Sequence, residues 1–169
     1  MKLTILAAIF ALSAANLLAG DPPNPGKGAA QLDKLKGLEG SWQATGKDGN
    51  PIHVSYKIVS AGSTLMETLD MAEHKESMVT LYHLNGDQVM LTHYCSMGNQ
   101  PRMKAMSSKD ENTLAFSFVD ATNLSSPDAA HMHKVVFTFK DNDHFTQEWT
   151  MRDKGKDAPP TVFNFERAK

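Results

Sequence analysis

The stretch HMHKVVFTFKDNDHFTQEWTMR, residues 131–152, decides the fold class. Apolar and polar side chains alternate along 131–140 and again along 144–152, and the polar triplet Asp141-Asn142-Asp143 separates the two runs. Successive side chains of a β-strand point to opposite faces, so this pattern predicts an antiparallel hairpin. When Lys140 is placed opposite His144, the apolar residues of both strands share one face, whereas a shift by one residue would mix them with polar ones. The predicted pairs are Phe139–Phe145, Phe137–Gln147, Val135–Trp149 and His133–Met151.

The same alternation continues outward from this hairpin to Gly40 on one side and to Arg167 on the other. Short runs rich in Val, Ile, Thr, Tyr and Phe are separated by turn signals, of which Asn85-Gly86 is typical of a type I′ hairpin turn. Nine or ten consecutive short strands remove their exposed edges by closing into a barrel. The sequence therefore predicts an all-β fold, a single antiparallel up-and-down β-barrel. The predicted strands are 40–46, 51–60, 63–71, 77–84, 87–96, 102–108, 113–120, 131–140, 144–152 and 161–167.

The chain begins with a segment typical of a secretory signal peptide. Lys2 precedes an apolar run, Leu3 to Leu12, and small residues follow it. Ser13 and Asn16 interrupt the apolar run, which is too short to span about 30 Å of hydrocarbon. We expect residues 1–20 to be removed, leaving an exported protein, periplasmic or secreted, with no stable membrane span.

The mature chain is predicted to hold one domain. Residues 21–31 are rich in Pro and Gly and are predicted to form a flexible leader. Leu32 to Leu38 then has the spacing of a short helical segment, one or two turns long. The barrel domain is expected to span residues 32–169.

Charge and cysteine content exclude some classes of protein. The formal net charge of the 169-residue chain is −2, whereas nucleic-acid binding needs a concentrated basic face. The single cysteine, Cys95, cannot form an internal disulfide, so stability must come from the core. Cys95 is predicted to be a small buried apolar residue, with an intermolecular disulfide or a ligand thiolate as the alternatives.

The segment Gly40-Ser41-Trp42 resembles the Gly-x-Trp signature of lipocalins and the wider calycin group. In that family the Trp closes one end of the barrel, and an Arg from a late strand lies across its ring. The resemblance implies these structural roles for Gly40, Trp42 and Arg167, with Arg152 as a second choice for the arginine. A guanidinium over an indole is a favourable cation–π pair.

The stretch from Gly62 to Met103, which includes GSTLMETLD and LTHYCSMGNQPRM, is also similar to a group of exported bacterial proteins of unknown function. That likeness implies the same layout for most of the mature chain and names no activity. The disulfide usual in lipocalins is absent, which counts against a role as a conventional extracellular transporter.

Polar side chains on the inward face are the candidate functional residues. Glu67 shares a face with Leu65 and Leu69, and Gln147 lies between Phe145 and Trp149. Buried polar groups cost roughly 1–3 kcal/mol if unpaired, so we expect them to pair with one another or with a ligand. Together they predict a pocket for a small hydrophobic or amphipathic molecule. The predicted ligand-binding set is Glu67, His93, Arg102, His131, His133, Gln147, Phe137 and Trp149, with Arg102 and His93 near the mouth. His131, His133 and Arg102 are the donors available to Glu67.

Two other functions remain open at this level. His131-x-His133 and His93-x-Cys95 place two potential ligands on one strand, as in a metal or haem site. Alternatively, the protein is a structural or stress-related envelope protein with a filled core. No nucleophile elbow or phosphate-binding glycine loop is present in the sequence, so it favours a non-enzymatic role and identifies no catalytic residue and no cofactor.

Overall fold

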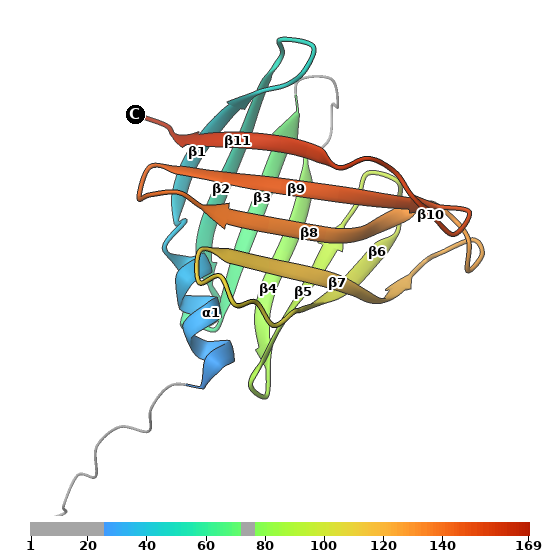
Figure 1. Cartoon of the computed structure of the whole chain (residues 1–169), viewed down its shortest axis with the longest axis horizontal. Helices are drawn as coiled ribbons and strands as arrows, with labels where there is room; N and C mark the ends of the chain where they lie inside the picture. Colours follow the sequence, from blue (N-terminus) through green and yellow to red (C-terminus); the bar gives the residue numbers. More distant parts are fainter. Residues whose placement is uncertain (1–25, 72–76) are drawn as a thin grey trace, which may run out of the picture.

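The computed structural model describes residues 26–71 and 77–169, and in these ranges the chain forms one α-helix and eleven β-strands (Figure 1). The predicted signal peptide, residues 1–20, lies outside the described residues. The elements are α1 (Lys27–Lys36), β1 (Gly40–Thr45), β2 (Pro51–Val59), a 3₁₀ turn (Ser60–Gly62), β3 (Thr64–Met71), β4 (Met78–Asn85), β5 (Gln88–Tyr94), β6 (Gln100–Ala105), β7 (Thr113–Thr122), β8 (His131–Phe139), β9 (His144–Asp153), β10 (Lys156–Asp157) and β11 (Thr161–Arg167).

Ten of these strands close into one antiparallel barrel. Each strand from β1 to β8 pairs with the next one along the chain, and β11 pairs with both β9 and β1. The two-residue β10 only extends the sheet beside the end of β9. The fold class predicted from alternation is therefore confirmed, because all pairings are antiparallel and the strands from β1 to β9 pair in chain order.

The register of the β8–β9 hairpin follows the prediction over most of its length. Phe139 faces Phe145, Phe137 faces Gln147 and Val135 faces Trp149. The predicted pair His133–Met151 is wrong. The register shifts between Met132 and Lys134, so Met132 faces Met151. A β-bulge of this kind puts an extra residue into one strand and changes which side chains point inward beyond it.

The helix α1 covers one end of the barrel (Figure 1) and begins earlier than the sequence analysis predicted. Leu32 and Leu35 are buried in the core, as their spacing requires. Residues 27–31, assigned to the flexible leader, are helical. The reason is a tertiary contact: Asp87 accepts a 2.8 Å hydrogen bond from the backbone N–H of Gly28, in the first turn of the helix, which is the kind of bond an N-cap supplies.

The β4–β5 hairpin provides that contact at its turn. Asn85 pairs with Gln88, so the two central turn residues are Gly86 and Asp87, one position later than predicted. Gly86 has a φ of +60°, and Asn85 and Asp87 do not have positive φ. This matches a type II′ turn, which needs glycine at its first central position, rather than the predicted type I′.

Trp42 and Arg167 lie at the end of the barrel that α1 covers. The indole of Trp42 is buried, packs edge-on against Phe145 and donates a 2.7 Å hydrogen bond to the carbonyl of Leu38. The guanidinium of Arg167 lies 4.1 Å from the centroid of the Trp42 ring, which is the contact expected from the sequence. Arg152, the second choice, bonds to Asp157 instead.

Arg167 also ties together three segments at this end. It donates hydrogen bonds to the carbonyls of Glu39, at 3.1 Å, and of Asn142, at 3.0 Å, in the β8–β9 turn. Gly40 has a φ of +120°, and a Cβ there would lie 3.3 Å from Nη1 of Arg167. Glycine at this position therefore allows both the backbone turn and the approach of the arginine.

A candidate binding site inside the barrel

Glu67, on β3, is the centre of a polar cluster buried in the barrel. Its side chain is completely inaccessible to solvent. Oε2 accepts hydrogen bonds from the hydroxyl of Tyr56, at 2.9 Å, from that of Tyr82, at 2.7 Å, and from the amide of Gln147, at 2.9 Å. These donors come from β2, β4 and β9, so the cluster connects opposite walls of the barrel.

The other oxygen of Glu67 leads to a histidine. Oε1 lies 3.4 Å from the hydroxyl of Thr80 on β4, and that hydroxyl lies 2.9 Å from Nδ1 of His93 on β5. Thr80 and His93 are both buried. Glu67, Thr80 and His93 therefore form a continuous hydrogen-bonded row across three neighbouring strands.

Burial dominates the ionisation of this cluster. It raises the pKa of Glu67, although the hydrogen bonds from Tyr82, Tyr56, Gln147 and Thr80 act in the opposite direction. Burial also raises the pKa of Tyr56 and Tyr82 well above the usual value, and the carboxylate of Glu67 adds to the rise. Both tyrosines stay protonated and serve as donors. Burial lowers the pKa of His93 to about 4, so this imidazole is neutral at pH 7.

Next to this row lies a cavity of about 190 Å³ at the end of the barrel opposite α1. Five of the ten methionines of the chain line it, together with other apolar side chains. The lining residues are Leu69, Met71, Met78, His93, Cys95, Ser96, Met97, Met132, Trp149, Met151, Thr161 and Phe163. Cys95 is buried here as a free thiol, in agreement with the expectation of a small apolar residue.

Two side chains of the cavity wall have buried nitrogen atoms without a hydrogen-bond partner in residues 26–71 and 77–169. They are His93, at Nε2, and Trp149, at Nε1, and their rings pack with centroids 4.7 Å apart. The described residues contain only two other buried side-chain atoms of this kind, Asn99 Oδ1 and Gln147 Oε1. An unsatisfied buried group costs about 1–3 kcal/mol, so a polar atom supplied from the cavity would be stabilising there.

The structure brings together only part of the predicted set. Glu67, Gln147, His93 and Trp149 belong to the cluster or to the cavity wall beside it. Phe137 is fully buried and packs edge-on against Tyr82, with ring centroids 6.0 Å apart. It therefore supports the polar cluster from the core and does not line the cavity.

The structure does not bring His131 and His133 to the Glu67 cluster or to its cavity, although His131 is itself buried. Both line a separate surface hollow, which they share with Phe118 and Arg152. His131 Nε2 lies 3.2 Å from His133 Nδ1, and the phenyl ring of Phe118 packs against both imidazoles. The cause is the bulge after Met132, which gives the inward position to that methionine.

The expectation that Arg102 meets Glu67 or lies near the mouth of the cavity is also wrong. Its side chain is half exposed and forms a two-bond ion pair with Asp120, at 2.5 and 2.6 Å. The neighbours Pro101 and Met103 are the buried residues of β6. Strict alternation along 101–103 would have placed Arg102 outside.

Sequence reasoning missed Tyr56, Tyr82 and Thr80 as partners of Glu67. Tyr56 on β2 and Thr80 on β4 pair directly with Glu67, and Tyr82 lies two residues after Thr80 on β4. The signal was present, because all three have hydroxyl groups at inward positions of strands next to β3. The predicted donors to the carboxyl group were instead His131, His133 and Arg102.

The proposed metal ligands do not converge. No group of three or more His, Cys, Asp or Glu side chains is placed to hold a metal ion within residues 26–71 and 77–169. His131 and His133 bond to each other, and Nδ1 of His93 is occupied by Thr80.

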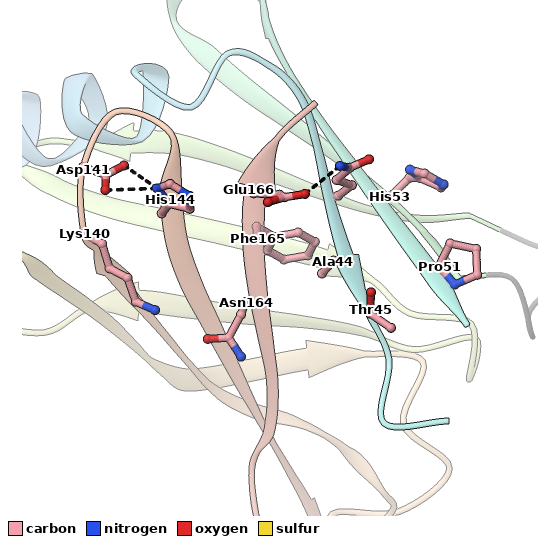
Figure 2. Close-up of a pocket in the computed structure, with 11 residues that line it drawn as sticks. Ala44, Thr45, Pro51, His53, Lys140, Asp141, His144, Asn164, Phe165 and Glu166 are labelled. Atoms are coloured by element: carbon pink, nitrogen blue, oxygen red, sulfur yellow. Dashed lines mark hydrogen bonds and ion pairs between the residues drawn. The ribbon is translucent and has the colours of Figure 1, made fainter. Parts of the chain in front are cut away.

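A larger hollow, of about 640 Å³, lies on the outer surface (Figure 2). It is found where β1 and β11 separate, since these strands pair only at Trp42–Arg167 and Gln43–Glu166. Lys140, Asp141 and His144 lie on one side of it and His53 on the other, with Asn164 between them (Figure 2). Its polar groups include mutual pairs, His144 with Asp141 at 2.8 Å and Gln43 with Glu166 at 2.7 Å. The interior cavity, with its unpartnered nitrogens, is the better candidate site.

Comparison with known proteins supports the barrel alone. The chain matches no protein-family model, and a search of curated proteins finds no match. Among solved structures, Rv2717c from M. tuberculosis is similar, with a TM-score of 0.60 and 19% identity over 82% of this chain and 97% of that one. A protein of unknown function from the DUF3598 family of Nostoc punctiforme PCC 73102 has a TM-score of 0.53 and 14% identity over 79% of this chain and 49% of its own. In the described part of the chain, no helix is long and apolar enough to cross a membrane. The fold that these neighbours share with the chain is a β-barrel, and the finer lipocalin-like assignment stays with the Gly-x-Trp resemblance.

Proposed function

We propose that this protein binds a small, mostly apolar molecule with one polar group in the cavity beside His93. The observation that carries the proposal is the pair of unpartnered nitrogens on His93 and Trp149, set in a wall that is otherwise apolar. Ligand pockets combine apolar lining with a few polar groups of this kind. Each group left without any partner would cost about 1–3 kcal/mol.

The size of the cavity limits the ligand. Its 190 Å³ is close to the roughly 150 Å³ of an engineered protein cavity that holds benzene, and below the roughly 300–1,000 Å³ typical of drug-sized ligands. A single ring with one or two short substituents fits. The methionine side chains that line the space are flexible and adapt to ligands of irregular shape.

The place of action is also part of the proposal. The charged start, apolar run and small residues of segment 1–20 support export, to the periplasm or beyond the cell. N-terminal sequencing of the protein from the exporting organism would give a first residue near Asp21. Recovery of Met1 on the exported protein would exclude cleavage.

Binding is tested with the protein stripped of ligand by unfolding in urea and refolding. Toluene and 1-phenylethanol serve as probes in calorimetric titrations. We expect saturable binding of both, and loss of binding in Met132→Trp, which fills the cavity from its wall. Met106→Trp is the matched control, because Met106 is exposed and lies outside the lining set. Absence of binding in the wild-type protein, or equal binding in both variants, would exclude the interior site.

Native mass spectrometry of the protein as purified from its own compartment identifies the natural ligand. We expect a non-covalent adduct that disappears after refolding. A bare mass in every preparation, together with no probe binding, would instead favour a structural protein with a filled core.

A further inference from the structure

The row Glu67–Thr80–His93 can carry its hydrogen bonds in two directions. Thr80 has one hydroxyl proton, which it gives either to Glu67 Oε1, 3.4 Å away, or to His93 Nδ1, 2.9 Å away. A neutral imidazole has a proton on only one of its two nitrogens. The direction chosen by Thr80 therefore determines which nitrogen of His93 is protonated.

When Glu67 is ionised, its carboxylate only accepts, so Thr80 donates to Oε1 and in turn accepts from Nδ1–H of His93. Nε2 of His93 is then a bare acceptor. When Glu67 is protonated on Oε1, it donates to Thr80, Thr80 donates to Nδ1, and Nε2 has the proton. One proton on Glu67 thus converts Nε2, which has no partner among the described residues, from an acceptor into a donor.

The hydrogen-bond donors around Glu67 favour its ionised state, against the burial that raises its pKa. All four side-chain hydrogen bonds at Glu67 run toward the carboxyl group, three to Oε2 and that of Thr80 to Oε1, which suits a carboxylate that only accepts. The groups that face Glu67 are Tyr56 from β2, Thr80 and Tyr82 from β4, and Gln147 from β9, with His93 of β5 beyond Thr80. The two tyrosines are protonated donors, and no Lys or Arg of the described chain bonds to the carboxylate.

We propose that Glu67, acting through Thr80, holds Nε2 of His93 as an acceptor, and that the cavity therefore selects ligands with a hydroxyl group. The inference rests on the proposed function, since it names the ligand class of the same cavity. A hydroxyl can donate to Nε2 of His93 and also accept from the indole N–H of Trp149, so it satisfies both unpartnered atoms. A ketone can only accept, and leaves Nε2 unsatisfied.

Glu67→Gln reverses the direction of the hydrogen bonds along the row Glu67–Thr80–His93, and the side chain keeps its size and shape. The amide oxygen takes the place of Oε2, because three donors require an acceptor there. The amide NH₂ then lies where Oε1 was and donates to Thr80. The variant is thus a fixed imitation of the protonated acid, and it should favour the Nε2–H form of His93.

The specificity test compares two compounds with the same skeleton, 1-phenylethanol and acetophenone, by calorimetry at pH 7.5. One net hydrogen bond corresponds to about a fivefold difference in affinity, so the wild-type protein should bind the alcohol about fivefold more tightly than the ketone. In Glu67→Gln the ratio should fall to about one or invert. An unchanged ratio in the variant would overturn the assignment of Glu67.

The coupling of Glu67 to His93 through Thr80 is tested without any ligand, by ¹⁵N NMR of the His93 ring at pH 7.5. We expect the Nδ1–H form in the wild-type protein and the Nε2–H form in Glu67→Gln. In the Thr80→Val background, which removes the linking hydroxyl, Glu67→Gln should no longer change the form. If His93 has its proton on the same nitrogen in the wild-type protein and in Glu67→Gln, the coupling through Thr80 is refuted, even if both compounds bind. Failure of both compounds to bind, with the expected change of form, would refute only the proposed function and its ligand class.

Discussion

The two tryptophans allow one substitution to be made in two opposite settings. Trp42 donates its indole N–H to the Leu38 carbonyl at 2.7 Å, whereas the indole N–H of Trp149 has no partner among the described residues. Both side chains are at least 96% buried, with exposed fractions of 1% and 4%. Replacement by phenylalanine removes the same atoms at both sites, so the effect of lost volume largely cancels when the two variants are compared.

The remaining difference comes from the hydrogen bonds. Trp42→Phe loses a bond worth about 1 kcal/mol, and Trp149→Phe removes an unsatisfied donor that costs about 1 kcal/mol or more. We therefore expect Trp42→Phe to lower the free energy of unfolding by about 2 kcal/mol more than Trp149→Phe does. The guanidinium of Arg167 over the Trp42 ring adds to this difference, because a phenyl ring is a weaker partner than indole for a cation.

Urea unfolding of the refolded, ligand-free proteins, followed by far-ultraviolet circular dichroism, measures the difference. With a urea dependence of about 1–3 kcal/mol per molar, the two midpoints should differ by about 1 M. Equal midpoints, or a lower midpoint for Trp149→Phe, would contradict the assignment of Trp149 as an unsatisfied donor. In the presence of 1-phenylethanol the difference should shrink, because Trp42→Phe keeps the indole N–H of Trp149, which the ligand then satisfies, whereas Trp149→Phe lacks it.

Three further outcomes follow from contacts described above. Arg167→Met should lower the free energy of unfolding by about 2 kcal/mol, since it removes the cation–π contact and two carbonyl partners. Arg102→Met, at an exposed ion pair, should lower it clearly less. Folding lowers the pKa of His93 from 6.5 to about 4, so the stability that the neutral ring contributes is complete above pH 6.5 and is lost as the pH falls toward 4. Between pH 7 and 4, urea midpoints should show His93→Gln losing less stability than the wild-type protein, by up to about 3 kcal/mol. Gly28→Ala should destabilise the protein by about 1–3 kcal/mol in the same assay, because a Cβ would lie 2.3 Å from the Asp87 carbonyl oxygen, and a neutral or stabilising effect would contradict that close approach.

The strand pattern was predictable because burial on one face imposes a period of two on the sequence. The pairs Phe139–Phe145 and Val135–Trp149 follow from that period alone. The bulge at Met132 could not be predicted in this way, since an extra residue interrupts the period without changing composition. His133 is the residue left unpaired at the interruption and His131 lies beyond it, so the period of two does not place their side chains.

The candidate site was predictable in its centre and not in its partners. Glu67 and Gln147 share inward positions on strands that the sequence already defined, and the structure joins them at 2.9 Å. The partners of Glu67 depend on which strands are neighbours and on their register. Neither can be read from the pattern of a single strand. The start of α1 is a similar case, because Asp87 reaches Gly28 from a distant hairpin.

The pairing of β1 with β11 has a consequence for the order in which the fold can assemble. These strands lie near opposite ends of the chain, and their ladder consists of two residue pairs. During synthesis, β1 has no second neighbour until the last residues have left the ribosome, so a growing or prematurely ended chain presents two open sheet edges able to join other chains. Contacts so distant in sequence also slow folding. A polypeptide that ends before residue 161 is therefore expected to aggregate rather than to form a smaller barrel.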